Sequence, residues 1–437
     1  MNTSPQQLKR VLNFWGAIML GLGSMIGTGV FVSIGLAAGI AGPAVILAVI
    51  LAAMVAVCNG LSSAQLAASH PVSGGTYEYG YRYLGSSFGF TAGWMFLIAK
   101  SASAASAALG FSGYVISLLG LTQRWWLPLA LFIVALFTLI VLGGIRRSNL
   151  TNTLIVSVTL LALLFFVVGG LPRVASEGGR NLLPFFAGPS GERPVRALFH
   201  AAAFMFVAYT GYGRIATLGE EVREPRRTIP RAIVVVMLVT LLLYLSVSLV
   251  GIGAVGAAQL SFAAKTNAAP LVAAAAQFDI PFAPQILSIG AVTAMLGVLL
   301  NLILGLSRVL LAMGRRGDMP APFARLNAAG TTPVWAVIAV GLGIAALVLI
   351  GDVRTTWSFS TFTVLIYYAL TNLSALRLAP EQRLAPAWLS VLGLLSCVFL
   401  AFWVEWQTWL MGLGLILLGL LWHAIVRKWT RQALASS

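Results

Sequence analysis

Long runs of apolar residues, separated by short polar connections, cover almost the whole chain of 437 residues. A helix needs about 20 consecutive apolar residues to cross the hydrocarbon core of a bilayer. Windows of that length predict twelve spans, centred near residues 24, 55, 103, 135, 160, 208, 242, 298, 342, 366, 395 and 418. We therefore predict an all-α integral membrane protein with twelve transmembrane helices, built as a single domain over residues 1–437.

The composition agrees with a chain that folds in lipid. Hydrophobic residues make up 59% of the sequence and charged residues only 9%, whereas a soluble domain carries about 25% charged residues. The two cysteines, Cys58 and Cys397, lie inside apolar spans. They are expected to be small core residues, and no disulfide is implied.

The net charge of +16 raises the possibility of nucleic-acid binding, but its distribution indicates membrane topology instead. If the N-terminus is cytoplasmic, twelve spans return the C-terminus to the same side. Eighteen of the 27 Lys and Arg residues then lie on the cytoplasmic side, seven lie in outer loops, and Lys100 and Arg214 fall within spans. Because cytoplasmic loops carry the excess of positive charge, we expect both termini inside and no nucleic-acid partner.

The first span contains an unusual segment, "GLGSMIGTGVF" (Gly21 to Phe31), with four glycines in nine residues. One explanation is close packing against another helix, since Gly23 and Gly27 have the spacing of small-xxx-small faces. The other is a break in the helix near the middle of the membrane. Unpaired backbone is tolerated at that depth only where it lines a cavity or meets a ligand. A broken helix offers amides to a carboxylate and carbonyls to an ammonium group, the two charged groups of an amino acid.

A second interruption strengthens the second explanation. The sixth span, "FMFVAYTGYGRIATLGEE" (Phe204 to Glu221), is interrupted by Thr210, Gly211, Gly213 and Arg214. Each interruption lies in the first helix of a set of five, over residues 11–170 and 197–378. Since five is odd, the second set enters the membrane from the opposite face. The sequence thus predicts a 5+5 inverted repeat with discontinuous helices 1 and 6, followed by helices 11 and 12 over residues 386–428.

Several blocks of sequence resemble the amino acid–polyamine–organocation (APC) transporters. These are the glycine-rich segment of helix 1, "HPVSGGTYEYGYRYLGSSFGFTAGW" (His70 to Trp94), "VAYTGYGRIATLGEEVREPRRTIPRAI" (Val207 to Ile233) and "GLSRVLLAMGRRGDMP" (Gly305 to Pro320). They are spread over the first ten spans in the order typical of that superfamily. The resemblance implies the inverted-repeat fold predicted above and secondary transport of amino acids or related amines by alternating access.

The resemblance also implies a substrate site at the two breaks. The substrate carboxylate would meet the backbone amides of Gly27, Thr28 and Gly29, and the Thr28 hydroxyl. The ammonium group would meet carbonyls, and either of two aromatic residues would close the site as a gate. The implied carbonyls belong to Met25, Ile26, Val207, Ala208 and Thr210, and the implied gates are Phe206 and Tyr209.

Two departures from the family pattern bear on substrate and coupling. Where many members have an acidic residue two places after the helix-6 glycine, this chain has Gly213. The absence of an acidic residue at this position, together with Arg214 beside Gly213, disfavours cationic substrates. Some relatives carry a helix-5 lysine that stands in for a sodium ion, and Thr159 aligns with that position. The coupling ion, proton or sodium, therefore stays open.

Two charges lie within the predicted spans. Lys100 is near the middle of the third span, where a charge costs at least about 3 kcal/mol on insertion scales. Either helix-end carbonyls and water satisfy it, or it replaces the missing helix-5 lysine as a gating or titrating group. Arg214 is nearer the cytoplasmic half, and its favoured partners are Glu220 or Glu221.

No catalytic or metal-binding set is present in the sequence. The three histidines are scattered, no cluster has metal-ligand spacing, and intramembrane acids are nearly absent. We therefore expect no enzyme activity, cofactor or metal. The favoured function is a multi-pass secondary transporter of small neutral amino acids in a bacterial-type inner (plasma) membrane, with amino acid and lipid as partners. The alternatives are an amino acid or polyamine exchanger, a channel or transport-linked sensor and, least favoured, an intramembrane enzyme.

Overall fold

The computed structural model describes residues 12–71, 74–144, 149–217 and 222–435. Within these ranges the elements are helical, apart from an isolated parallel bridge between Leu12 and Val222. The α-helices are α1 (Phe14–Met25), α2 (Ile34–Ala41), α3 (Val45–Ser69), α4 (Thr76–Tyr83), α5 (Ser86–Leu119), α6 (Trp126–Leu142), α7 (Asn149–Asn181), α8 (Pro194–Tyr209), α9 (Gly213–Thr217), α10 (Pro225–Asn267), α11 (Pro270–Ala275), α12 (Ala283–Arg315), α13 (Val334–Val348), α14 (Val353–Leu376), α15 (Ala387–Ala401) and α16 (Trp406–Ala435). Shorter π or 3₁₀ turns are η1 (Gly29–Ser33), η2 (Gly42–Ala44), η3 (Gln123–Trp125), η4 (Thr210–Tyr212), η5 (Ala321–Ala324) and η6 (Pro380–Gln382).

The helices coincide with the apolar windows because a helix satisfies its own backbone polar groups, as lipid requires. Eight helical runs in the described ranges are long and apolar enough to cross a membrane. They contain nine of the twelve predicted centres, since the run Phe14–Ser69 contains two. Two further centres lie in the shorter apolar helices α13 and α15, and the centre near residue 208 lies in α8. The fold is therefore all-α and membrane-integral, while the count of twelve crossings stays a prediction.

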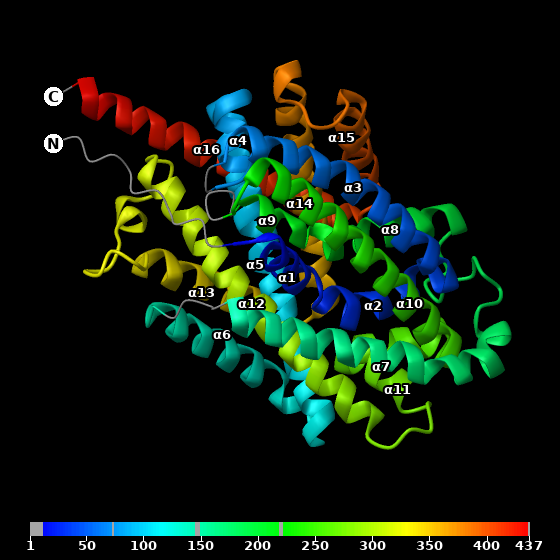
Figure 1. The fold of residues 1–437 in the computed structure, drawn as a ribbon. Coiled ribbons are helices and arrows are strands. Elements are labelled where there is room, and N and C mark those ends of the chain that lie inside the picture. The colour runs from blue at the N-terminus through cyan, green and yellow to red at the C-terminus, as the bar shows by residue number, and fades with distance from the viewer. Residues whose placement is uncertain (1–11, 72–73, 145–148, 218–221, 436–437) are drawn as a thin grey trace.

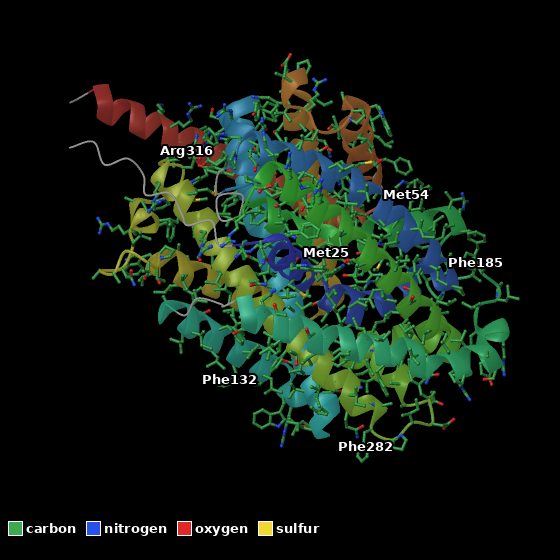
Figure 2. The ribbon with its side chains drawn as sticks, in the orientation of Figure 1. Met25, Met54, Phe132, Phe185, Phe282 and Arg316 are labelled. Carbon is green, nitrogen blue, oxygen red and sulfur yellow. The ribbon has the colours of Figure 1, made fainter. Side chains whose placement is uncertain are left out.

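The helices differ in how deeply they are buried. The most apolar windows of α5 and α14 are each 72% buried, whereas those of the α6 and α16 runs are 22% and 17% buried. Figure 1 shows α1 and α2 in the middle of the assembly and α6 and α13 along one edge. Apolar side chains such as Phe132, 60% exposed, project from the outside of the assembly (Figure 2). Polar groups on α1, α5 and α14 are therefore shielded by the surrounding helices.

A polar cluster ties three helices together at one end of the assembly. Asp318, which follows α12 and is 5% exposed, accepts hydrogen bonds from Tyr77 and Tyr81 of α4 at 2.7 and 2.6 Å. Its backbone carbonyl accepts a hydrogen bond from Trp422 of α16 at 3.0 Å. Burial, and then the hydrogen bond to Asp318, raise the pKa of both tyrosines above the usual range. Both phenols therefore remain protonated donors at neutral pH.

Candidate functional site

The first helix is interrupted at the glycine-rich segment. α1 ends at Met25, and Ile26 is extended, with φ −82° and ψ 100°. Helical structure then resumes through the π turn η1 and continues as α2. The amides of Val30 and Phe31 both donate to the Gly27 carbonyl at 3.1 Å. The amides of Gly27, Thr28 and Gly29 precede them, at the N-terminal end of the second half-helix. No preceding helical turn supplies carbonyl acceptors for amides at such an end.

The second interruption lies at the end of α8. That helix stops at Tyr209, the 3₁₀ turn η4 follows, and α9 begins at Gly213. The residues at this turn are buried: Tyr209 is 0% exposed and Thr210 is 2% exposed. Polar backbone groups at this turn are therefore removed from solvent and must be satisfied by other parts of the protein.

The two interruptions lie against each other. A methyl group on Gly211 would be 2.4 Å from the Ser24 carbonyl oxygen, and one on Gly29 would be 2.6 Å from the Ala208 Cβ. Real side chains do not approach so closely, so both positions require glycine for the backbones to meet. Met25, at the end of α1, lies in the interior of the assembly, as Figure 2 shows. The segments that sequence reasoning assigned to one site are thus in direct contact.

Two tyrosines that sequence reasoning did not select hold the backbone at the breaks. The Tyr244 hydroxyl of α10 lies 2.8 Å from the Met25 carbonyl oxygen and 3.2 Å from that of Ala208. The Tyr368 hydroxyl of α14 donates to the Thr210 carbonyl at 3.1 Å. A tyrosine within an apolar span indicates a buried polar contact, because its buried hydroxyl needs a hydrogen-bond partner. The sequence does not say which partner.

Lys100 lies at the second break. Its Nζ donates to the Thr210 Oγ1 at 2.7 Å, and that hydroxyl donates to the Val207 carbonyl at 2.7 Å. Lys100 is only 8% exposed. α5 thus brings an ammonium group to the interrupted end of α8, and the expectation that Lys100 faces the protein interior is correct.

The remaining predicted residues at the breaks are buried but differ in their contacts. The Thr28 Oγ1 has no hydrogen-bond partner among the described residues. The Phe206 ring makes an edge-to-face contact with Tyr368, with centroids 5.7 Å apart, and the Tyr209 ring lies 5.1 Å from Tyr244. Both candidate gates are therefore packed on the tyrosines that hold the breaks.

The two other candidates for coupling or gating occupy different surroundings. Thr159, 2% exposed on α7, donates its hydroxyl to the Ile155 carbonyl of its own helix at 2.8 Å. The Arg214 guanidinium lies against α12, since a methyl group on Gly305 would be 2.6 Å from its Nη1. The partners expected for Arg214, at residues 220 and 221, lie outside the described residues.

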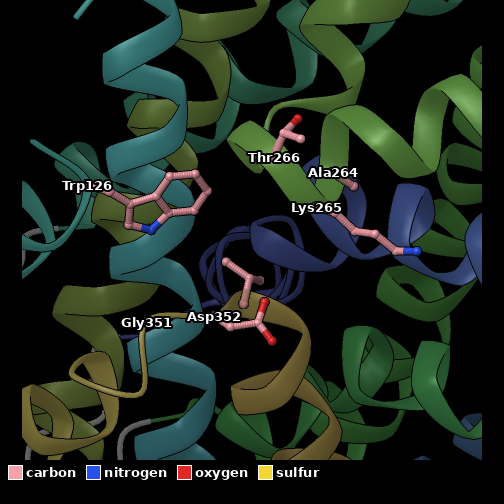
Figure 3. A pocket seen from close by; sticks show the side chains of 7 residues that line it. Trp126, Ala264, Lys265, Thr266, Gly351 and Asp352 are labelled. Atoms are coloured by element: carbon pink, nitrogen blue, oxygen red, sulfur yellow. The ribbon is translucent and has the colours of Figure 1, made fainter. Parts of the chain in front are cut away.

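A separate hollow of about 190 Å³ lies at the ends of α6, α10 and α14, away from the predicted site residues (Figure 3). Its lining residues are Trp126, Ala264, Lys265, Thr266, Gly351, Asp352 and Val353. The Asp352 carboxylate caps α14 by accepting from the amides of Arg354 and Thr355 at 3.1 and 2.8 Å. The side chain is thus already engaged in the structure of the helix.

Comparison with known proteins adds independent findings. The model of the family described as amino acid permease matches residues 16–436. An uncharacterized transporter of Mycobacterium tuberculosis is 38% identical over 429 residues, which is 98% of this chain and 94% of the relative. The branched-chain amino acid permease BcaP of Bacillus subtilis is 28% identical, covering 95% of this chain and 92% of BcaP. The methylthioribose transporter of the same organism is 29% identical, covering 86% and 84%.

Proposed function

Because the chain belongs to the amino acid permease family, we propose that it is a secondary transporter that moves small neutral amino acids across the membrane by alternating access. The family makes it a membrane-integral transporter of amino acids and not an enzyme. The observation that carries the finer proposal is the direct contact between the two interrupted helices, with Gly211 against Ser24 and Gly29 against Ala208.

The substrate carboxylate is assigned to the N-terminal end of the second half of helix 1. The amides of Gly27, Thr28 and Gly29 lie there, and the positive end of the helix dipole attracts an anion. The buried Thr28 hydroxyl, unpartnered among the described residues, supplies a further donor. A buried hydroxyl without a partner costs free energy, which a bound carboxylate would recover.

The substrate ammonium group is assigned to carbonyls of both breaks. Those of Met25, Val207, Ala208 and Thr210 each accept a hydrogen bond from a side chain within the protein. A carbonyl oxygen has two lone pairs, so the Val207 and Thr210 carbonyls can each accept the ammonium group as a second donor. The Ile26 carbonyl completes the proposed set, and Phe206 or Tyr209 would cover the occupied site.

The charges around the second break favour a neutral side chain on the substrate. Lys100 contacts this break, and Arg214 follows it on α9. Gly213, where many family members have an acid, instead lies against the Tyr368 hydroxyl. A cationic side chain would therefore meet the like charge of Lys100, and Gly213 provides no carboxylate to offset it.

The proposed architecture follows the broken helices. Residues 11–170 and 197–378 would form two inverted repeats, residues 386–428 would add two helices, and twelve crossings would place both termini in the cytoplasm. The proposed location is the inner membrane, with lipid around the apolar edge. Lys100, Thr159 and Arg214 are the candidates for coupling or gating, and proton and sodium both remain candidates for the coupling ion.

A thermal-shift screen of the purified protein tests the substrate class. A ligand that binds only the folded state raises the melting temperature in proportion to the logarithm of its concentration above Kd. Alanine and similar amino acids are expected to raise it, and arginine and polyamines are not. Stabilisation by arginine or polyamines alone would overturn the neutral preference. Uptake into proteoliposomes should saturate and be stimulated by substrate on the opposite side, whereas a channel would show neither property.

A further inference from the structure

Tyr244 occupies a position between the two broken helices that the proposed function assigns to the substrate. The residue is 0% exposed on α10. Its hydroxyl lies 2.8 Å from the Met25 carbonyl oxygen and 3.2 Å from the Ala208 carbonyl oxygen. One of these carbonyls comes from each interrupted helix, so the two breaks share the one proton of this hydroxyl.

The same hydroxyl also borders the amide end of the site. A methyl group on Gly29 would lie 3.3 Å from the Tyr244 oxygen and 2.6 Å from the Ala208 Cβ. The hydroxyl therefore sits where the end of α1, the start of η1 and the end of α8 converge. An amino acid bound at this junction would have to share or replace its hydrogen bonds.

We propose that the Tyr244 hydroxyl is a stand-in for the substrate ammonium group, holding the two breaks together in the empty transporter and giving way when the amino acid binds. This inference rests on the proposed function, since it needs an ammonium at the Met25 and Ala208 carbonyls. Both groups donate hydrogen bonds to the same acceptors, so substrate binding becomes an exchange of donors. Buried carbonyls then have a donor in both the empty and the occupied states.

Loss of the Tyr244 hydroxyl should raise the free energy of the empty state but not that of the substrate-bound state. Tyr244→Phe removes the hydroxyl and leaves two carbonyls without this donor only when the site is empty. A substrate ammonium satisfies them in the variant without displacing anything. The affinity for alanine should therefore rise, by about tenfold for one recovered hydrogen bond. Net uptake, which requires the empty transporter to return, should slow relative to exchange, which does not.

A matched control is available in Tyr114 of α5. It is also buried, and its hydroxyl donates at 2.6 Å to the Phe31 carbonyl, farther along the same broken helix. Tyr114→Phe removes the same chemical group from a carbonyl that is not assigned to the ammonium. Its alanine affinity and its ratio of exchange to net uptake should match those of the unmodified protein.

The experiment measures binding of alanine and of propionate, which lacks the amine, to the purified protein and to both variants. Tighter alanine binding by Y244F alone, without tighter propionate binding, supports the proposal. Unchanged or weaker alanine binding by Y244F, or equal strengthening of propionate, overturns it. If Y244F is too unstable to purify alone, alanine during purification should restore its yield more than that of Y114F, and no rescue overturns the proposal.

Failure of the proposed function has a different signature. If neither alanine nor another amino acid binds or exchanges with the unmodified protein, the assigned substrate class is wrong. If alanine binds and exchanges but Y244F behaves like Y114F, only the role of Tyr244 is wrong.

Discussion

Lys100 combines a buried charge with an uncharged hydrogen-bond partner, and this sets its expected behaviour on substitution. Lys100→Met keeps the length of the side chain but removes the charge and the donor to Thr210. A buried charge costs free energy, and the Thr210 hydroxyl keeps its bond to the Val207 carbonyl when Lys100 is replaced. We therefore expect the melting temperature to be unchanged or higher, while the uptake of alanine falls about tenfold, the scale of one charged hydrogen bond. Uptake by proteoliposomes over a range of pH and a melting curve measure the two effects.

The exposed lysine of α10, Lys265, provides a control of the same residue type. Lys265→Met should change neither uptake nor its pH profile, because this side chain is exposed to solvent at the rim of a separate hollow. If K100M transports at the unmodified rate with the same pH profile, Lys100 has no gating or coupling role.

Glu192 gives a prediction about stability and pH outside the membrane-spanning segments. Its carboxylate accepts from the His200 Nδ1 at 3.3 Å, and its other oxygen lies 3.5 Å from the Arg196 Nε. The hydrogen bond from His200, followed by the charges around it, lowers the pKa of Glu192 below its ordinary value of 4.5 despite partial burial. The stabilisation is therefore complete above that pH and is lost as the pH falls through the folded-state pKa.

Glu192→Gln should consequently lower the melting temperature at pH 7. The loss in the free energy of unfolding should be less than about 1 kcal/mol, because the ion pair is partly exposed. The difference from the unmodified protein should shrink below pH 4.5. Melting curves between pH 7 and pH 3.5 test this, with the exposed Glu381→Gln variant as the control. A difference that stays constant over the whole range would contradict the assignment.

What the sequence reveals about single residues depends on whether their partners are near in the chain. The cost of a charge in lipid predicts that Lys100 faces inward, because that rule needs no partner. Its contact with Thr210 joins residues 110 positions apart. The role of Tyr244 depends on the carbonyls of Met25 and Ala208, which meet only in the folded protein. No local pattern encodes such an encounter.

At the scale of elements, the glycines of helix 1 serve both purposes that the sequence suggested. Gly23 packs against Asn152 and Val156 of α7, which is the close-packing use. Between Met25 and Gly29 the helix is interrupted, which is the other use. The pattern of glycines predicts the segment where the helix is weak. It cannot distinguish packing from breakage residue by residue, because that depends on which neighbour lies opposite each glycine.

Gly211 offers the sharpest test of the contact between the two breaks. A methyl group there would lie 2.4 Å from the Ser24 carbonyl oxygen, and backbone cannot move aside as a flexible side chain can. Gly211→Ala should therefore separate the interrupted helices, lower stability by about 1–3 kcal/mol as overpacking does, and abolish uptake. Melting temperature and uptake by proteoliposomes measure both effects.

Gly343 of α13 is the matched control, because a methyl group there would meet nothing within 4 Å. Gly343→Ala should leave uptake unchanged and stabilise the helix by up to about 1 kcal/mol. If G211A instead transports like the unmodified protein, the contact between the breaks does not matter for transport.

At the scale of the whole molecule, apolar length predicts where helices occur, because lipid forces each segment to satisfy its own backbone. This rule places the windows near residues 103 and 298 inside α5 and α12. It does not foresee features decided by tertiary contact. Among these are the kink of α10 at Gly256, where φ is 79°, and the tyrosine bonds to Asp318 that join α4 to the end of α12.

The orientation in the membrane is a whole-molecule prediction that cysteine labelling can decide. The native cysteines, Cys58 and Cys397, are 6% and 0% exposed, so replacing them gives a background without reactive thiols. Single cysteines are then introduced at two exposed positions, Ser176 near the end of α7 and Ala329 in the connection before α13. The positive-inside bias assigns Ser176 to the outside and Ala329, which follows Arg325, to the cytoplasm.

A membrane-impermeant maleimide should therefore label S176C in intact cells and label A329C only after the membrane is permeabilised. Both sites must react in detergent, which shows that neither thiol is hidden by the fold. The opposite pattern would place both termini outside. Labelling of both sites from the same side would mean that the chain crosses the membrane an even number of times between residues 176 and 329. That result would overturn the proposed inverted arrangement of the two five-helix sets.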